Sequence, residues 1–292
     1  MTAPTIVANV ITVDGWSCYD YQDPPPDDDG NIWVWQEVTG WFGGLDPRGA
    51  PVARPLVDGD YDGIAPFSGR TVTITGALVA TSRGGLQRGL DRIAGVLAGA
   101  TRRGVLVVDE QHVPVVRSAS VRLGGATMAT REGPTHAKWS LVLYAADPTR
   151  YGVDAHSATL APFTPGAGRT YNLAPPRVYG GLGTDGRTTV TNRGNANTPL
   201  TVTFYGPSKN PTLQLIGGAR LQLLMTLGDG EWVTIDSAQR SVLYNGSASR
   251  RQFLSGDSRW IYLPPGPSDL FYTVAVNSGV GQCVATWRDG WS

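Results

Sequence analysis

Short runs of alternating apolar and polar residues dominate this chain, and they predict β-strands. The clearest run covers residues 70–80, where Val72, Ile74 and Leu78 alternate with threonines. Threonine suits a pleated surface with one face toward water. Further strands in the first half are predicted around Trp33 and Trp35 and at residues 105–108, 113–117, 121–123 and 138–145.

A 3.6-residue apolar period appears once, and it predicts one helix. The stripe consists of Leu86, Leu90, Ile93, Ala94 and Leu97. Two glycines, Gly89 and Gly95, fall inside it and cost about 1 kcal/mol each relative to alanine. The helix is therefore expected to depend on packing against a sheet.

The second half shows short strands separated by turn residues, a pattern typical of a β-sandwich. The predicted strands are 188–192, 200–205, 212–216, 221–226, 232–235, 241–244, 260–263, 271–276 and 284–287. Residues 151–171 are rich in Ala, Thr, Pro and Gly and have no periodicity, which indicates a connection. We predict an N-terminal domain over residues 1–155, a linker over 156–172 and a C-terminal β-sandwich domain over 173–292.

Composition predicts a globular protein, and its low, balanced charge would also suit a subunit of an assembly. Of its 292 residues, 41% are hydrophobic, 16% are charged, and the formal net charge is zero. Nucleic-acid binding is not expected, because it requires a basic excess or stripe. The first residues lack a signal-peptide pattern and no apolar run is long enough to span a bilayer, so we expect no membrane association and assembly in a cytoplasm.

Two motifs resemble ligand sites but are better explained as turns. Residues 181–186 match G-x-G-x-x-G, but the strand-like RTTVTN follows where a nucleotide site needs a helix. Asp58, Asp60 and Asp62 alternate as in a calcium loop, but the twelfth position is Gly69 and not glutamate. We interpret these as a hairpin loop and a polar turn.

Catalytic and redox residues are scattered. His112, His136 and His156 have no zinc-type spacing, and no G-x-S-x-G or S-x-x-K motif is present. Cys18 and Cys283 are far apart in sequence and are expected to be buried free thiols. We therefore expect no enzyme activity, no cofactor and no metal.

Tryptophan is frequent, with nine residues, and most are expected in the core. If exposed, aromatic rings on the C-terminal domain would favour a carbohydrate-binding module, either alone or as a recognition subunit. The candidate ligand or partner aromatics are Trp232, Trp260, Tyr262 and Tyr272. A cell-wall hydrolase is a further alternative, and it would need two carboxylates about 5 to 10 Å apart across a cleft.

The ordered segments resemble those of the siphophage distal tail protein, or minor tail protein, family. In the first half these are GRTVTITG, the short helix and WSLVLYAADPTRY. In the second half they are TNRGNANTPLTVTFYGPSKNPTL, GDGEWVTID, RSVLYNGSASR, LPPG and the closing WRDGW. The resemblance covers most of the chain from about Gly59, and the acidic, Trp-rich segment 14–58 is the part that maps least onto it.

The resemblance implies a mainly β protein with a barrel-like or sandwich N-terminal domain containing one helix and a galectin-like C-terminal β-sandwich. It implies a structural role in the virion, at the tail tip or baseplate of a long-tailed bacteriophage. The N-terminal domain would form a homo-oligomeric ring, a hexamer in the family. The partners implied are the tail tube protein, the tape-measure protein and the tail-tip hub or fibre proteins.

Overall fold

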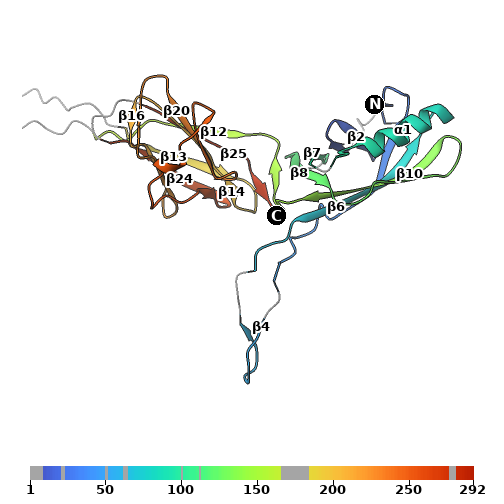
Figure 1. Cartoon of the computed structure of the whole chain (residues 1–292), viewed down its shortest axis with the longest axis horizontal. Helices are drawn as coiled ribbons and strands as arrows, with labels where there is room; N and C mark the ends of the chain where they lie inside the picture. Colours follow the sequence, from blue (N-terminus) through green and yellow to red (C-terminus); the bar gives the residue numbers. More distant parts are fainter. Residues whose placement is uncertain are drawn as a thin grey trace, which may run out of the picture. The chain divides into compact units, whose positions relative to one another are not determined.

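The chain folds into two compact units in a computed structural model (Figure 1). The structure describes residues 9–20, 24–49, 52–61, 65–99, 101–111, 113–165, 184–275 and 281–292. Unit 1 comprises Met1–Val153 with Ser292, and unit 2 comprises Asp154–Trp291. Each is mainly β-structure, which confirms the predicted fold class.

Unit 1 is built around a sheet that closes on itself. Its strands follow the order β11-β8-β7-β1-β2-β3-β6-β10-β9, and a further pairing of β8 with β10 closes the ring of strands into a barrel. The bounds are β1 Val10–Val13, β2 Trp16–Tyr19, β3 Ile32–Thr39, β6 Arg70–Val79, β7 Gly104–Asp109, β8 Arg117–Leu123, β9 Met128–Arg131, β10 His136–Ala145 and β11 Arg150–Gly152. Closure leaves fewer free strand edges, which are otherwise prone to uncontrolled pairing.

Strand β6 forms the centre of the unit 1 sheet. It pairs antiparallel with β3 on one side and with β10 on the other. Val72, Ile74 and Leu78 are buried, while the intervening threonines are exposed or half-buried, as the alternation predicted. Leu141 of β10 lies opposite Ile74 and is also buried, so both strands contribute one face to the same core.

The predicted helix is present as α1, Arg83–Gly95. Ser82 caps it by accepting a hydrogen bond from the Gly85 backbone N at 3.0 Å. Leu86 and Ile93 are buried in the unit 1 core. A Cβ at Gly89 would lie 2.7 Å from a Leu78 methyl, so this glycine allows the helix to pack closely on β6.

The first half differs from the sequence prediction in several details, including the strands β1, β2, β9 and β11, which were not predicted. Residues 113–117 and 121–123 do not form separate strands, because one strand, β8, covers Arg117–Leu123 and pairs along β7. Within the turn-rich region a short hairpin forms from β4, Val52–Ala53, and β5, Asp60–Tyr61. Pairing with β7, a long-range contact, determines where β8 begins and ends. Local periodicity does not report such a contact.

Unit 2 is a sandwich of two main sheets over one hydrophobic core. One sheet has the order β12-β25-β15-β20-β21-β22 and the other β13-β24-β17-β18, with two small ribbons, β14-β23 and β16-β19. The first sheet comprises β12 His156–Leu160, β25 Cys283–Trp287, β15 Thr201–Tyr205, β20 Trp232–Asp236, β21 Ser241–Tyr244 and β22 Ala248–Ser249. The second comprises β13 Arg187–Asn192, β24 Gly266–Thr273, β17 Thr212–Leu215 and β18 Arg220–Gln222. The ribbons comprise β14 Thr198–Pro199, β23 Tyr262–Leu263, β16 Ser208–Lys209 and β19 Thr226–Leu227.

The start of the predicted linker needs correction. Residues 156–160 form β12, which pairs in register with β25 from His156↔Trp287 to Leu160↔Cys283. Leu160 is buried in the unit 2 core, so this segment belongs to the sandwich. The remainder of the predicted linker includes residues 166–172, which lie outside the described residues.

Candidate assembly surfaces

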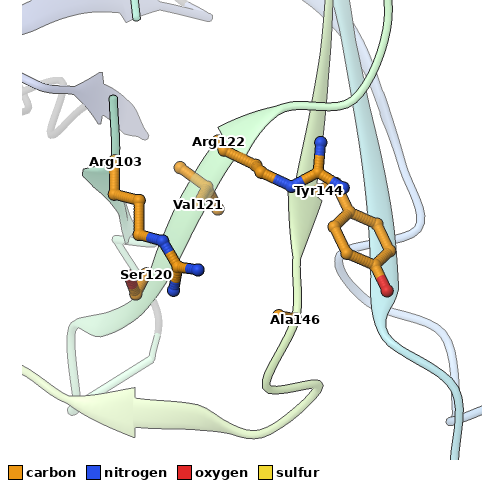
Figure 2. Close-up of a pocket in the computed structure, with 6 residues that line it drawn as sticks. All are labelled: Arg103, Ser120, Val121, Arg122, Tyr144 and Ala146. Carbon is orange, nitrogen blue, oxygen red and sulfur yellow. The ribbon is translucent and has the colours of Figure 1, made fainter. Parts of the chain in front are cut away.

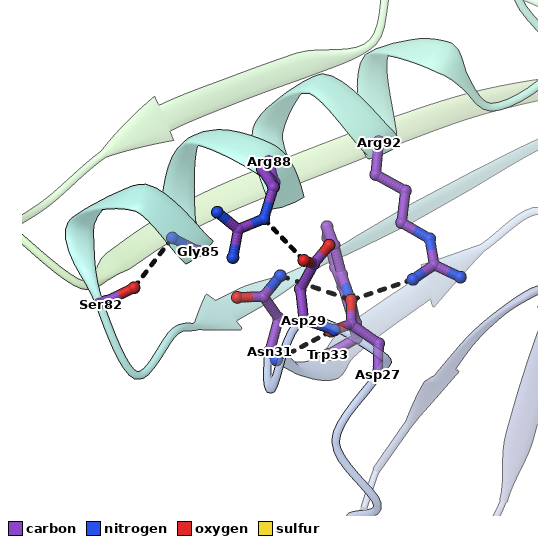
Figure 3. A network of polar contacts seen from close by, with 8 residues as sticks. All are labelled: Asp27, Asp29, Asn31, Trp33, Ser82, Gly85, Arg88 and Arg92. Carbon is purple, nitrogen blue, oxygen red and sulfur yellow. Dashed lines mark hydrogen bonds and ion pairs between the residues drawn. The ribbon is translucent and has the colours of Figure 1, made fainter.

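The loop before β3 is bound to helix α1 by the carboxylates of Asp27 and Asp29 (Figure 3). Asp27 accepts hydrogen bonds from Trp33 Nε1 at 2.9 Å and from the Asn31 backbone N at 2.8 Å. Arg92 of α1 pairs with the same carboxylate at 3.1 Å. Burial tends to raise the pKa of Asp27, but the hydrogen bonds from Trp33 and the loop backbone outweigh it and lower the pKa below its usual value.

The same loop leads into an aromatic cluster in the barrel core. Asp29 forms a second ion pair to the helix, with Arg88 at 2.6 Å. Trp16 packs edge-to-face against Trp33 and Trp139, with ring centroids 5.2 and 5.1 Å apart. The acidic, Trp-rich segment is therefore partly core and partly anchor, and the predicted burial of Trp33 is confirmed.

Two buried arginines hold the chain where it leaves the barrel toward the β4–β5 hairpin. Arg70 donates to the carbonyl oxygens of Gly40, Trp41 and Gly43 at 2.8, 3.1 and 3.0 Å. Arg150 donates to the Trp41 carbonyl at 2.6 Å and lies over the Trp41 ring. Burial, followed by repulsion from Arg70, lowers the pKa of Arg150 to about 10, so Arg150 remains charged at neutral pH.

The hairpin itself, defined here as residues 52–61, is exposed along its whole length. Its tip carries Leu56 at 105% relative exposure and Val57 at 68%. Asp58 and Asp60 follow, and neither forms an ion pair within the described parts of the chain. Apolar side chains without contacts at the end of a hairpin are typical of a surface that meets another molecule.

A basic surface lies on the outside of the barrel (Figure 2). A shallow depression there is lined by Arg103, Ser120, Val121, Arg122, Tyr144 and Ala146. Arg122 stacks over the Tyr144 ring at 4.7 Å. No described carboxylate forms an ion pair with Arg103 or Arg122. Neither arginine was singled out from the sequence, although the alternation along β8 places Arg122 on its outer face.

The four aromatics proposed for ligand binding do not all lie at the surface. Tyr272 is fully buried and stacks on Phe204 in the core at 5.8 Å. Its place in an exposed ligand platform is therefore wrong, because Tyr272 and Leu270 share the inward face of β24. Burial also raises the pKa of Tyr272.

The other three aromatics are half-buried or exposed, and each has a neighbour within the chain. Tyr262 is 38% exposed, and its hydroxyl donates to the Ser237 carbonyl at 3.1 Å. Trp260 packs against the unit 2 core under Arg251. Trp232 lies opposite Tyr205 in the β15–β20 pair. Their proposed role in ligand binding stays a prediction.

The remaining titratable candidates that the structure describes form no group that could hold a metal. Among the described residues, no three His, Cys, Asp or Glu side chains lie close enough together to hold a metal. His156 pairs with the buried Asp289 at 3.1 Å. Asp62, His112 and residues 181–183 of the glycine motif lie outside the described residues. In the part of the chain that the structure describes, no helix is long and apolar enough to cross a membrane.

Both cysteines are free and buried, as predicted. Cys18 lies in the unit 1 core and Cys283 in the unit 2 core. Burial raises the pKa of each thiol. A desolvated thiol contains little thiolate and reacts slowly, which fits a packing role.

Comparison with known proteins shows what the sandwich is similar to. Residues 193–291 match the family model "Siphovirus-type tail component, C-terminal domain". No curated protein matches the sequence. Among solved structures, the phage SPP1 Dit (gp 19.1) protein, titled a paradigm of the hub adsorption apparatus in phages that infect Gram-positive bacteria, is similar with a TM-score of 0.68 and 16% identity over 97% of this chain and 99% of that chain.

A chain of the phage P2 baseplate in its activated conformation is also similar, with a TM-score of 0.50 and 8% identity over 96% of this chain and 98% of that chain. At these identities the structural likeness establishes a common fold. The resemblance to siphophage distal tail proteins is therefore confirmed, by sequence for the C-terminal domain and by fold for the whole chain.

Proposed function

We propose that this protein is a non-enzymatic structural component of a bacteriophage tail hub or baseplate, located in the virion tail. The observation that carries the proposal is the tail-component match over residues 193–291 within a chain whose whole length shares the fold of a hub protein. Fold alone does not determine function, and here the family match in the C-terminal domain supplies the more specific link.

The proposed mechanism is geometric. The N-terminal domain forms a homo-oligomeric ring, a hexamer by analogy with the family, and this ring continues the tail tube. A cyclic ring uses head-to-tail contacts, so each subunit needs two different and complementary surfaces. The barrel of unit 1, with its anchored loop before β3 and the arginine-bound segment after it, offers ordered surfaces for such contacts. The tube, tape-measure and hub or fibre proteins are the proposed neighbours.

Two measurements test this proposal together. Antibodies against the C-terminal domain, applied to intact virions, should label the distal end of the tail by immunogold microscopy. Light scattering coupled to size exclusion should give a species of about six times the 31.0 kDa chain. Labelling confined to the capsid, or absence of the protein from virions, would exclude the tail assignment. A different ring size would correct only the copy number.

A further inference from the structure

We propose that the β4–β5 hairpin of one subunit docks on the basic outer surface of the barrel of a second copy of this chain. The basic surface is defined as Arg103, Val105, Ser120, Arg122 and Tyr144. This inference rests on the ring of the proposed function and names the two surfaces through which its subunits meet.

The first argument is charge complementarity within a single sequence. The hairpin presents Asp58 and Asp60 without an ion-pair partner among the described residues. Its one arginine, Arg54, lies over the Tyr61 ring, and the hairpin keeps a net negative charge. The barrel presents Arg103 and Arg122 without an ion pair to a described carboxylate, and both line the depression drawn in Figure 2. Opposite charges on two separate surfaces favour a head-to-tail contact and disfavour the pairing of two identical surfaces.

The second argument is the matching apolar area. Leu56 and Val57 at the hairpin tip make little contact with their own chain. On the barrel, Val105 is 50% exposed and lies opposite Ser120 in the β7–β8 pair, next to the two arginines. An apolar centre with a charged rim is the usual composition of a protein interface.

The third argument is that the hairpin starts from a fixed base. Arg70 binds three carbonyl oxygens of the segment that leads out of β3, and it is itself the first residue of β6, the strand that follows the hairpin. Arg150 binds the Trp41 carbonyl of the same segment. A preordered base reduces the conformational entropy that the hairpin would lose on docking.

Charge exchange between two variants provides the test. The first variant, Asp58→Arg with Asp60→Arg, has a basic hairpin and a basic barrel surface. The second, Arg103→Asp with Arg122→Asp, has an acidic hairpin and an acidic barrel surface. Each variant alone repels itself, so we expect the concentration for half-assembly to rise at least about tenfold over that of the natural protein.

An equal mixture of the two variants should assemble again, because every hairpin then meets a barrel surface of opposite charge. Such a ring alternates the variants and closes only with an even number of subunits. The chain with all four substitutions should also assemble. Both recoveries should weaken as salt is raised from about 0.05 to 0.5 M, because exposed charges are screened.

A matched control separates specific contacts from general charge effects. Asp229→Arg with Arg240→Asp reverses two exposed side chains of unit 2 and should leave assembly unchanged. Circular dichroism and thermal melting of every variant establish that it is folded. Leu56→Ser, which removes apolar area without changing charge, should weaken assembly in the same assay.

The outcomes discriminate clearly. Assembly that recovers only in the mixture and in the chain with all four substitutions supports the proposed contact. Unchanged assembly of each folded variant alone, or no recovery on mixing, overturns it while leaving the tail assignment to the virion labelling. A natural protein that stays monomeric at all concentrations also overturns it, because the second copy is the proposed occupant.

Discussion

The indole Nε1 of Trp33 donates a hydrogen bond to the carboxylate of Asp27 across 2.9 Å. This bond joins a surface loop to the aromatic cluster inside the barrel, and Arg92 extends it to helix α1. The Asp27 side chain therefore links the polar loop to the apolar core of the barrel.

Replacing this carboxylate should reveal a pH-dependent stability. Because the pKa of Asp27 is lowered in the folded state, its contribution is present above the ordinary aspartate pKa of about 3.9 and is lost as pH falls through the lower folded value. Asp27→Asn should cost about 1–2 kcal/mol of unfolding free energy at pH 7.

Urea unfolding of both proteins between pH 7 and pH 3 measures this difference. We expect the gap between the natural protein and Asp27→Asn to be constant at neutral pH and to narrow below about pH 4. The exposed Asp28→Asn is the matched control and should show no such dependence. A gap that does not change with pH would show that the carboxylate charge is not involved.

The buried arginine at the base of the hairpin should be more important than a surface ion pair. Arg70→Met removes the donor to several backbone carbonyls, and we expect a loss of about 3 kcal/mol or more. Arg88→Met, which removes an exposed pair with Asp29, should cost less than about 1 kcal/mol. Thermal and urea unfolding measure the loss of unfolding free energy in both variants. Equal losses would contradict a stabilising role for the Arg70 hydrogen bonds.

Gly40 tests the same base through the backbone. It has φ +78°, and a Cβ there would lie 1.9 Å from the Thr71 carbonyl oxygen. Gly15 has φ +84° with nothing within 4 Å, so Gly15→Ala isolates the backbone strain at about 1–2 kcal/mol. In urea unfolding, Gly40→Ala should lose at least about 2 kcal/mol more unfolding free energy than Gly15→Ala. Similar losses in the two variants would mean that the backbone around Gly40 and Thr71 moves apart at little cost.

The two thiols report on each unit separately. Since burial raises the pKa of Cys18 and Cys283, neither should react with a thiol reagent at pH 7 while its unit is folded. Urea should expose them, and mass spectrometry of the labelled peptides assigns each to its unit. Rapid labelling of either residue in the native protein would contradict its place in the core.

The sequence by itself determined the local structure. The alternation at residues 70–80 identified β6, and the stripe from Leu86 identified α1, because periodicity directly reports which residues share a face. The ordered turns of the second half also sufficed to predict the sandwich and its family resemblance. Buried thiols followed from their isolation in a chain with no metal spacing.

Only the tertiary structure decided which faces are covered. Tyr272 alternates correctly with its neighbours, but a single strand does not reveal which of its two faces meets the opposite sheet. Several contacts join residues that are distant in sequence. They are the closure of the barrel by β8 and β10, the hydrogen bond from Arg150 to the Trp41 carbonyl, and the depression that Arg103 and Arg122 line together. Such contacts arise from packing of whole elements, and local patterns contain no record of them.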